Sequence, residues 1–297
     1  MENRQKRTFI PGDEWVYFKL YTGYKTADSI LANVLSIAIM ELHARDMVQK
    51  WFFIRYADPE FHLRVRLLVT DKKHLSSVIE VFYRELEPYV SQDLIWKVQL
   101  DTYQREIERY GRSSIALAES IFHSDSDAIV QVLREVESPG KDEQRWLVAL
   151  KMVDEMLSDF KLDIHRRSSL LDALSADFKT EMGFHLKGFK LQLDRKFRAH
   201  RAAVTHVLEQ GQPAALPIGM QHILNQRSSQ IRPFTDKLLQ MEKENQLDIP
   251  MEQFLRSVIH MTINRMFRSK QRIYELVIYD MLRRYYISMI AKSKRIA

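Results

Sequence analysis

The chain has 297 residues, of which 45% are hydrophobic and 28% are charged. This composition allows a sizeable buried core and argues against a wholly disordered chain. Cysteine is absent, which excludes disulfide bonds, thiolate metal sites and a cysteine nucleophile. No apolar run is expected to reach the length needed to cross a bilayer, and the N-terminus lacks the apolar core of a secretory signal. We therefore expect a cytoplasmic protein.

The formal net charge is +6, and the excess lies in two stretches rich in Lys and Arg, 184–201 and 265–295. Such stretches can attract nucleic acid, an anionic membrane or an acidic peptide. Helix faces that are simply exposed to solvent give the same pattern. Composition leaves both interpretations open.

The first third of the chain mixes strand-like and helix-like patterns. Residues 15–22 (WVYFKLYT) predict a strand, because they are rich in aromatic residues. The period then becomes helical over 26–47, where Asp28 or Ser29 could be the N-cap. Two more strands are expected at 50–56 and 62–69, joined by a turn-rich link of hairpin length.

A helix follows over 71–90, with Asp71 as its N-cap and its end near Pro88. Residues 93–104 return to alternation and predict a strand. Its apolar residues can share one face: Leu94, Trp96, Val98 and Leu100.

Beyond residue 111 the period is helical almost to the end of the chain. The expected helices are 114–123, 126–136, 142–160, 166–208, 221–245, 251–268 and 271–291. Breaks are expected at 124–127 (SDSD), at 138–143 (SPGKDE), around Gly183 and Gly188, and in a loop at 210–219.

Strands followed by helices predict an α+β fold, in which N-terminal strands with a hairpin form a small mixed or antiparallel sheet before a predominantly helical remainder. We expect one domain over 1–297, strand-rich from 10 to 110 and helical from 111 to 297.

The segment HLRVR (62–66) raises the first functional question. On a strand, His62, Arg64 and Arg66 share one face, with neighbours about 7 Å apart. Arginine binds carboxylate or phosphate through bidentate pairs. A solvated strand face, or salt bridges to acidic residues of helices, explains the pattern more simply, and the pattern alone favours this interpretation. Arg55 could join this basic face or oppose it, because the register is unknown.

Two later segments carry further candidates. In DTYQREIERYG (101–111), Glu106 and Arg109 are i,i+3 neighbours and could form an ordinary ion pair. In SVIHMTINRMF (257–267), His260 and Asn264 share a helix face. Histidine can move a proton near neutral pH, although a lone histidine on an amphipathic helix is more often structural.

The common nucleotide-binding and hydrolase motifs are absent, and the ten histidines do not pair with carboxylates at metal-ligand spacing. We therefore expect neither a cofactor nor a metal.

Taken together, KWFFIRYADPEFHLRVRL (50–67), DTYQREIERYG and SVIHMTINRMF resemble the signature blocks of the lantibiotic dehydratase C-terminal domain, also called the thiopeptide-type bacteriocin biosynthesis domain. The resemblance spans roughly residues 15–290. The chain departs from the family pattern at Thr262, where a second histidine is common, and at Arg112, where glycine is common.

The resemblance implies a standalone enzyme (a lyase) that removes glutamate from glutamylated Ser or Thr of a lanthipeptide or thiopeptide precursor by β-elimination, which leaves dehydroalanine or dehydrobutyrine. By motif match, its catalytic residues would be Arg64, Arg66, Arg109 and His260, supported by Glu106, Asn264 and Arg265. The arginines would hold the glutamyl carboxylates or a developing oxyanion, and His260 would move a proton.

The implied partners are the leader and core of the precursor peptide and a separate tRNA-dependent glutamylating subunit. A cyclase and a homodimer are further options, and direct binding of tRNA is not expected. Two alternatives stay open. One is a [4+2] cycloaddition of two dehydroalanines that forms a pyridine. The other is a non-catalytic module that binds the precursor through its basic stretches, including Lys187, Lys190 and Lys196.

Overall fold

The computed structural model describes residues 5–136, 144–181, 187–210, 216 and 219–296. The chain forms two compact units. Unit 1 comprises Met1–Arg134 and Lys237–Ser269, and unit 2 comprises Glu135–Asp236 and Lys270–Ala297. The described strands all lie in unit 1 and unit 2 is helical, so the predicted α+β class is confirmed. The expectation of a single domain over 1–297 stays a prediction.

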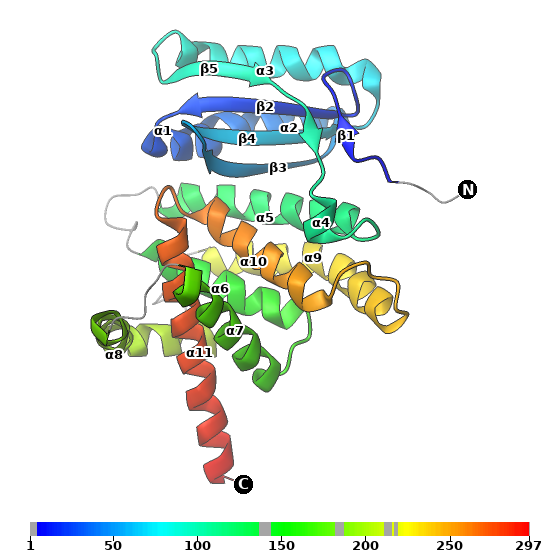
Figure 1. Cartoon of the computed structure of the whole chain (residues 1–297). Coiled ribbons are helices and arrows are strands. Elements are labelled where there is room, and N and C mark those ends of the chain that lie inside the picture. Colours follow the sequence, from blue (N-terminus) through cyan, green and yellow to red (C-terminus); the bar gives the residue numbers. More distant parts are fainter. Residues whose placement is uncertain (1–4, 137–143, 182–186, 211–215, 217–218, 297) are drawn as a thin grey trace. The chain divides into compact units, whose positions relative to one another are not determined.

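A four-stranded antiparallel sheet forms the centre of unit 1 (Figure 1). In sheet order its strands are β3 (Val48–Ala57), β4 (Phe61–Val69), β2 (Trp15–Thr22) and β5 (Ile95–Leu100). A separate short pair joins β1 (Thr8–Phe9) to β6 (Tyr103–Gln104). The predicted strands 15–22, 50–56 and 62–69 are confirmed, and the predicted strand 93–104 divides into β5 and β6.

The register of the sheet answers the question about Arg55. Arg55 lies opposite Leu63 on β4, whereas Arg64 lies opposite Ile54 on β3 and Lys19 on β2. Because side chains alternate along a strand, Arg55 projects from the other face of the sheet than Arg64. Its guanidinium is buried and pairs with Asp28, with 2.6 Å between Nη2 and Oδ1.

The helix after β2 begins earlier than predicted. It runs through α1 (Tyr24–Ser29), the π-helical segment η1 (Ile30–Leu35) and α2 (Ser36–Ala44). Gly23 is its N-cap residue, so the predicted cap at Asp28 or Ser29 is wrong. Asp28 lies inside the helix instead, where its carboxylate binds Arg55 and Arg268.

This helix, Tyr24–Ala44, is by length and composition long and apolar enough to cross a membrane, which inspection of the sequence did not anticipate. More than half of its most apolar stretch is buried within the protein, including Leu31, Leu35 and Leu42. This burial is typical of a core helix that packs on a sheet.

The helix between β4 and β5 follows its prediction closely. Asp71 accepts a hydrogen bond from the Lys73 amide and caps the short 3-10 turn η2 (Lys72–His74), which leads into α3 (Leu75–Val90). The helix continues two residues past Pro88. Phe82 stacks on Phe18 of β2, with 4.4 Å between ring centroids, so α3 packs on the sheet face opposite Arg64.

The remaining helices of unit 1 are α4 (Ile107–Tyr110), most of α5 (Ile115–Val136) and α10 (Met251–Met266). The predicted break at 124–127 is wrong, because α5 runs through it. Two side chains of this segment bind β3: Ser126 accepts the Phe53 amide, and Asp127 accepts the Trp51 indole N–H. These bonds remove the competition that usually ends a helix at Ser and Asp.

Helix α10 closes the same outer edge of β3. The Asn264 side chain accepts the Arg55 amide at 3.0 Å and donates to the Arg55 carbonyl at 2.9 Å. The Arg265 Nε donates to the Phe53 carbonyl at 2.9 Å. An amide and a guanidinium thus replace the backbone of a neighbouring strand, and the edge of β3 is satisfied.

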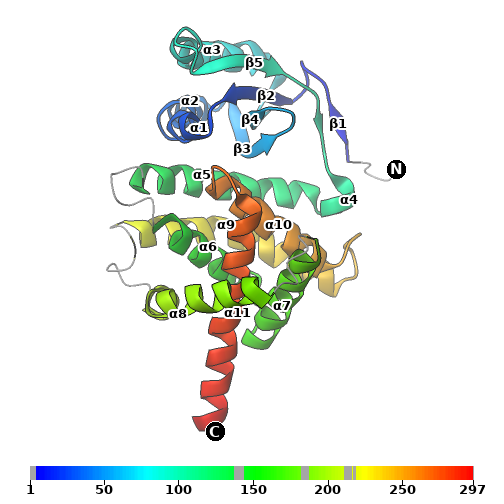
Figure 2. The same ribbon diagram turned by 60° about the vertical axis from the view of Figure 1, so that its left-hand side comes forward.

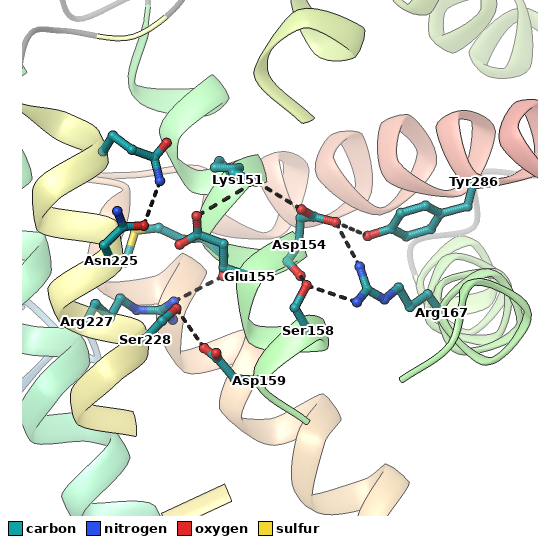
Figure 3. Close-up of polar contacts among 12 residues, drawn as sticks. Lys151, Asp154, Glu155, Ser158, Asp159, Arg167, Asn225, Arg227, Ser228 and Tyr286 are labelled. Carbon is teal, nitrogen blue, oxygen red and sulfur yellow. Dashed lines mark hydrogen bonds and ion pairs between the residues drawn. The ribbon is translucent and has the colours of Figure 1, made fainter. Parts of the chain in front are cut away.

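Unit 2 contains α6 (Arg145–Asp159), α7 (Ile164–Glu181), α8 (Lys187–Gln210), α11 (Gln271–Ile296) and most of α9 (Met220–Lys243). Figure 3 shows the polar network around α6. Asp154 accepts the Tyr286 hydroxyl at 2.5 Å and pairs with Arg167 and Lys151, while Asp159 accepts the Ser228 hydroxyl at 2.9 Å. These bonds hold polar groups of α6 inside the helical core.

Several predictions concern residues outside the described part of the chain. They are the break at 138–143, the interruption at Gly183, most of the loop at 210–219, and residues 184–186 of the first basic stretch. The described helices on either side of Gly183 are α7 and α8, and Gly188 lies within α8.

Candidate functional site

Cationic side chains gather on one face of the sheet. The register places Lys19 beside Arg64 and Gln99, Tyr21 beside His62 and Lys97, and Tyr17 beside Arg66. We call this surface the basic face and define it by Lys19, His62, Arg64, Arg66 and Lys97. The predicted sharing of one face by His62, Arg64 and Arg66 is therefore confirmed. A uniformly solvated strand face is not what the structure shows, because His62 and Arg66 are buried.

Arg66 is the most enclosed cation of the basic face, with 6% of its surface exposed. Its guanidinium carbon lies 4.6 Å, 4.8 Å and 5.3 Å from the ring centroids of Tyr17, Tyr103 and Phe52. Rings at such distances stabilise a cation through their negative faces. They cannot accept the hydrogen bonds of its in-plane N–H groups, however. Within the described residues, Nε and Nη1 of Arg66 have no hydrogen-bond partner.

Tyr17, Tyr103 and Phe52 form an aromatic box around Arg66, and a buried ion pair fixes one of its walls. Arg105 binds Glu119 through two contacts of 2.6 Å, from Nε and from Nη2. The Tyr103 hydroxyl donates to the same carboxylate at 2.8 Å. Burial, reinforced by the charge of Glu119, raises the pKa of Tyr103 well above its ordinary value, so it stays a neutral donor. Glu119 therefore holds Tyr103 beside Arg66.

Arg66 lines a small cavity of about 20 Å³, which is room for one water molecule. Around it lie residues from β3, β6, α4, α5 and α10. The lining includes Phe52, Tyr103, Glu106, Tyr110, Phe122 and Met261. Of the predicted site residues, the structure thus brings Arg66 and Glu106 to one cavity.

Arg109 reaches this region through Glu106. The predicted i,i+3 ion pair is confirmed, with 3.2 Å between the Arg109 Nε and a Glu106 carboxylate oxygen, and both side chains are about half exposed. Burial raises the pKa of Tyr110, whereas Arg109 opposes this rise. Arg109 therefore lies near the Tyr110 hydroxyl at the margin of the cavity.

The backbone geometry explains why residue 111, at the end of the segment RYG (109–111), is a glycine. Gly111 ends α4 with a φ of +75°, and a Cβ there would lie 2.8 Å from the Ser114 Oγ. A side chain would therefore be strained and would clash. Asp248 accepts the Ser113 amide at 2.7 Å just beyond this turn. The turn fixes the position of the short helix that carries Glu106 and Arg109.

Arg64 is held differently from Arg66. Its guanidinium carbon stacks 3.4 Å from the ring centroid of Tyr56, and its Nε donates to the Nε2 of His62 at 3.1 Å. Because Nε2 accepts, the Nδ1 of His62 carries the hydrogen and donates to the Glu60 carbonyl at 2.9 Å. His62 therefore orients Arg64, a role that the sequence did not indicate.

This geometry predicts a pH dependence of stability. Burial lowers the pKa of His62 below 6.5, with smaller contributions from Arg64 and Lys19 that the Glu60 carbonyl and Asp101 oppose. The unfolded chain then binds a proton at higher pH than the folded protein. The contribution of neutral His62 to the free energy of unfolding is complete above about pH 6.5 and is lost as the pH falls through the lowered pKa. Urea unfolding between about pH 5 and pH 7.5 should show it.

The matched variant is His62→Gln, which cannot titrate but can still accept from Arg64. Its free energy of unfolding should fall less on acidification than that of the wild type. Parallel curves for the two proteins would show that His62 keeps an ordinary pKa and has no such role.

The three site residues predicted on α10 have different surroundings. His260 is half-buried and immediately precedes Met261, which lines the cavity. Asn264 and Arg265 bind the backbone of β3, as described above. Thr262, a departure from the family pattern, is buried and donates to the Val258 carbonyl at 3.3 Å.

Among the described residues, no group of three or more His, Asp or Glu side chains could hold a metal ion. The basic face and its cavity offer fixed cations and tyrosine hydroxyls whose pKa is raised, and the half-buried His260 lies on α10 next to Met261 of the cavity lining.

Comparisons with known proteins agree with these motifs. The family model described as "Lantibiotic biosynthesis dehydratase C-term" matches residues 15–286. The chain belongs to this family. The match includes the whole sheet and all predicted site residues, so the resemblance expected from the three sequence blocks is confirmed.

Two curated relatives are much longer proteins than this chain. The nisin biosynthesis protein NisB of Lactococcus lactis subsp. lactis is 29% identical over 140 residues, which are 46% of this chain and 14% of NisB. The subtilin biosynthesis protein SpaB of Bacillus subtilis is 25% identical over 178 residues, which are 59% of this chain and 17% of SpaB. The matched regions thus span less than a fifth of these relatives.

Several solved structures share the fold of this chain. The tRNA-dependent lantibiotic dehydratase MibB of Microbispora sp. 107891 matches with a TM-score of 0.74 at 21% identity, over 96% of this chain and 29% of MibB. TsrL and the pyridine synthase TbtD from thiomuracin biosynthesis both match with a TM-score of 0.65, at 14% and 13% identity. Those two matches cover 92% of this chain and 94% and 99% of theirs.

Proposed function

We propose that this chain eliminates glutamate from glutamylated Ser or Thr residues of a ribosomal precursor peptide. The observation that carries the proposal is Arg66, a buried cation whose Nε and Nη1 have no partner among the described residues. Burying an unsatisfied donor destabilises a protein, so its retention in an aromatic box favours a role in binding an anion. A glutamyl carboxylate is such an anion.

In the proposed reaction, the Cα proton of the modified residue leaves to a base and a Cα–Cβ double bond forms. The Cβ–O bond breaks, and glutamate departs with its α-linked carboxyl group as a carboxylate. Arg66 binds the charge on the departing group, and Arg64 and Arg109 bind a further carboxylate or the developing enolate oxygen. His260 moves the proton. Glu106 orients Arg109 through their ion pair.

The proposed partners follow from this reaction. The substrate is a precursor peptide, and a separate glutamylating subunit prepares it, because the proposed reaction consumes residues that are already glutamylated. The family membership and the relatives NisB and SpaB, which are nisin and subtilin biosynthesis proteins, support this assignment.

A second candidate is the formal [4+2] cycloaddition of two dehydroalanines. The observation that favours it is size: the match to the pyridine synthase TbtD covers almost the whole of both chains. The higher TM-score and identity of MibB favour elimination instead.

A parallel assay separates the candidates. The purified chain is incubated with a glutamylated peptide and, separately, with a peptide that already contains several dehydroalanines, and both are followed by mass spectrometry. Elimination predicts loss of the glutamyl group from the first peptide only. Cleavage of the second peptide with release of its leader would indicate cycloaddition, and no change in either would indicate a binding module.

His260→Ala tests the proton-transfer role within this assay. We expect elimination to slow by about 10²- to 10⁴-fold, which is the usual contribution of a positioned acid or base. His222→Ala is the matched control, because His222 is exposed on α9. Full turnover by His260→Ala would remove His260 from the mechanism without affecting the fold assignment.

A further inference from the structure

The two edges of the sheet in unit 1 are treated in opposite ways. The backbone of edge strand β3 is closed by side chains of α5 and α10, which include Ser126, Asn264 and Arg265. The other edge strand is β5, and within the described residues no strand pairs with its outer side. In Figures 1 and 2, β5 lies at the border of the sheet with α3 alongside.

The ladder between β2 and β5 shows which groups point outward. The Asp101 amide donates to the Tyr17 carbonyl on β2 at 3.0 Å. Backbone groups alternate in direction along a strand, so those of Gln99 also point to β2. The amide and carbonyl groups of Val98 and Leu100 therefore point away from the sheet. A strand lying beside β5 could bind them.

The outer border of β5 is apolar where most exposed edges are charged. Trp96, Val98 and Leu100 are 49%, 41% and 39% exposed. Val98 and Leu100 lie opposite Leu20 and Phe18, on the sheet face that α3 covers. Beyond them, α3 exposes Ile79 and Tyr83 one helical turn apart. Soluble proteins usually protect an edge with proline, a bulge or inward-pointing charge. β5 has a register shift at Trp96, but its pairing with β2 is regular from Lys97 to Leu100. An apolar edge over these residues indicates a binding surface.

A small cavity continues this apolar border. It has a volume of about 50 Å³, and its lining is mostly apolar, with Val16, Leu75, Ile79 and Leu100 beside Tyr17 and Asp101. The Asp101 carboxylate pairs with Lys19. One aliphatic side chain of a bound segment could enter the cavity.

The opposite face of β5 carries Lys97, whose Nζ lies 4.9 Å from the ring centroid of Tyr21 and has no acidic partner among the described residues.

We propose that an extended peptide segment with alternating apolar and acidic residues adds to β5 as a fifth strand. Its apolar side chains would lie against Trp96, Val98 and the exposed face of α3, and its acidic side chains would meet Lys97 on the basic face. Main-chain bonds supply affinity in this mode, and alternate side chains supply selectivity.

The charge of Lys97 favours an acidic peptide over a second copy of the chain as the segment that pairs with β5. The strand IWKVQL contains Lys97 and no acid. Pairing of two copies through β5 would bring two Lys97 side chains to the same face, which is unfavourable. An acidic partner removes that conflict. The proposal concerns binding alone and does not depend on the reaction proposed above.

The probe is a fluorescein-labelled octapeptide in which valine alternates with glutamate, and a second probe carries lysine in place of glutamate. We expect the glutamate probe to bind the full chain by fluorescence anisotropy and the lysine probe to bind at least about tenfold more weakly. Hydrogen exchange should show new protection of residues 96–100 when the glutamate probe is bound.

Val98→Pro is the decisive variant. Proline removes an amide that points outward, so no bond to β2 is lost, and edge strands tolerate proline at such positions. We expect binding to weaken by about tenfold or more, whereas Val98→Ala, which keeps the amide, should weaken it by about threefold at most. Circular dichroism and thermal unfolding verify that both variants are folded.

Lys97→Glu should weaken binding of the glutamate probe and strengthen binding of the lysine probe. Lys243→Glu, at an exposed position of α9, controls for net charge. The proposal is overturned if the glutamate probe fails to bind at millimolar concentration, or if Val98→Pro and Lys97→Glu leave its affinity unchanged. A dimer in sedimentation that Val98→Pro dissociates would also overturn it, in favour of pairing between copies.

Discussion

Replacing Arg66 with methionine should abolish most of the elimination activity while leaving the folded state as stable as before, or more stable. The guanidinium of Arg66 is buried with Nε and Nη1 unbound among the described residues. Removing it ends that penalty, and methionine fills aromatic surroundings well. We expect the free energy of unfolding to rise by up to about 1 kcal/mol. Loss of a charge that stabilises the transition state should slow turnover by about 10²- to 10³-fold.

Arg105→Met is the matched control for this prediction. Arg105 is almost equally buried, but it pairs with Glu119 through two short contacts. Removing one partner of a buried pair costs about 3–5 kcal/mol. Urea unfolding should therefore separate the two variants, with Arg105→Met much less stable and Arg66→Met not. Equal destabilisation by both changes would show that Arg66 is a structural residue, and the anion-binding role would then have no support.

The sheet could be predicted from the sequence because its signal is local. The alternation in WVYFKLYT and HLRVRLLV reproduces the bounds of β2 and β4 to within a residue. The prediction of a helix break at 124–127 is wrong because of tertiary contacts. Ser126 and Asp127 would compete with the helix backbone in isolation, but β3 supplies their partners from more than 70 residues away. No local pattern contains that information.

In the candidate site, too, local features could be predicted from the sequence and tertiary contacts could not. Period two placed His62, Arg64 and Arg66 on one face, yet it could not distinguish Arg66 in its aromatic box from Arg64 on Tyr56. That difference depends on the register with β3 and on Tyr103, which a later segment contributes. His62 received no role because its partners, the Glu60 carbonyl and Arg64, depend on the conformation of the hairpin.

The motif also grouped residues that act in different ways. His260 and Asn264 share a helix face in the sequence, but Asn264 binds the backbone of Arg55 and so belongs to the closure of β3. Residues of one sequence motif can therefore serve chemistry and folding separately. The distinction is testable, because a residue that closes the edge should affect stability before it affects turnover.

Arg265→Met should destabilise the protein by about 3–5 kcal/mol, the usual effect of breaking a fully buried ion pair. The Arg265 Nη1 lies 3.1 Å from the Asp125 carboxylate, and both side chains are buried. The variant also loses the bond from Nε to the Phe53 carbonyl, which leaves an acceptor on β3 without this donor. Urea unfolding gives the free energy. Arg45→Met, which breaks an exposed pair with Glu41, should change it by less than about 0.5 kcal/mol.

A double-mutant cycle with Asp125→Asn isolates the pair from the bond to β3. We expect a coupling energy of about 1–3 kcal/mol between Arg265 and Asp125, because the residues are in direct contact. Strictly additive losses would show that Arg265 stabilises β3 through its backbone bond alone. At a temperature where Arg265→Met remains folded, it should retain far more elimination activity than Arg66→Met, since Arg265 positions β3 and does not meet the substrate. A loss of turnover equal to that of Arg66→Met would instead place Arg265 in the anion-binding machinery.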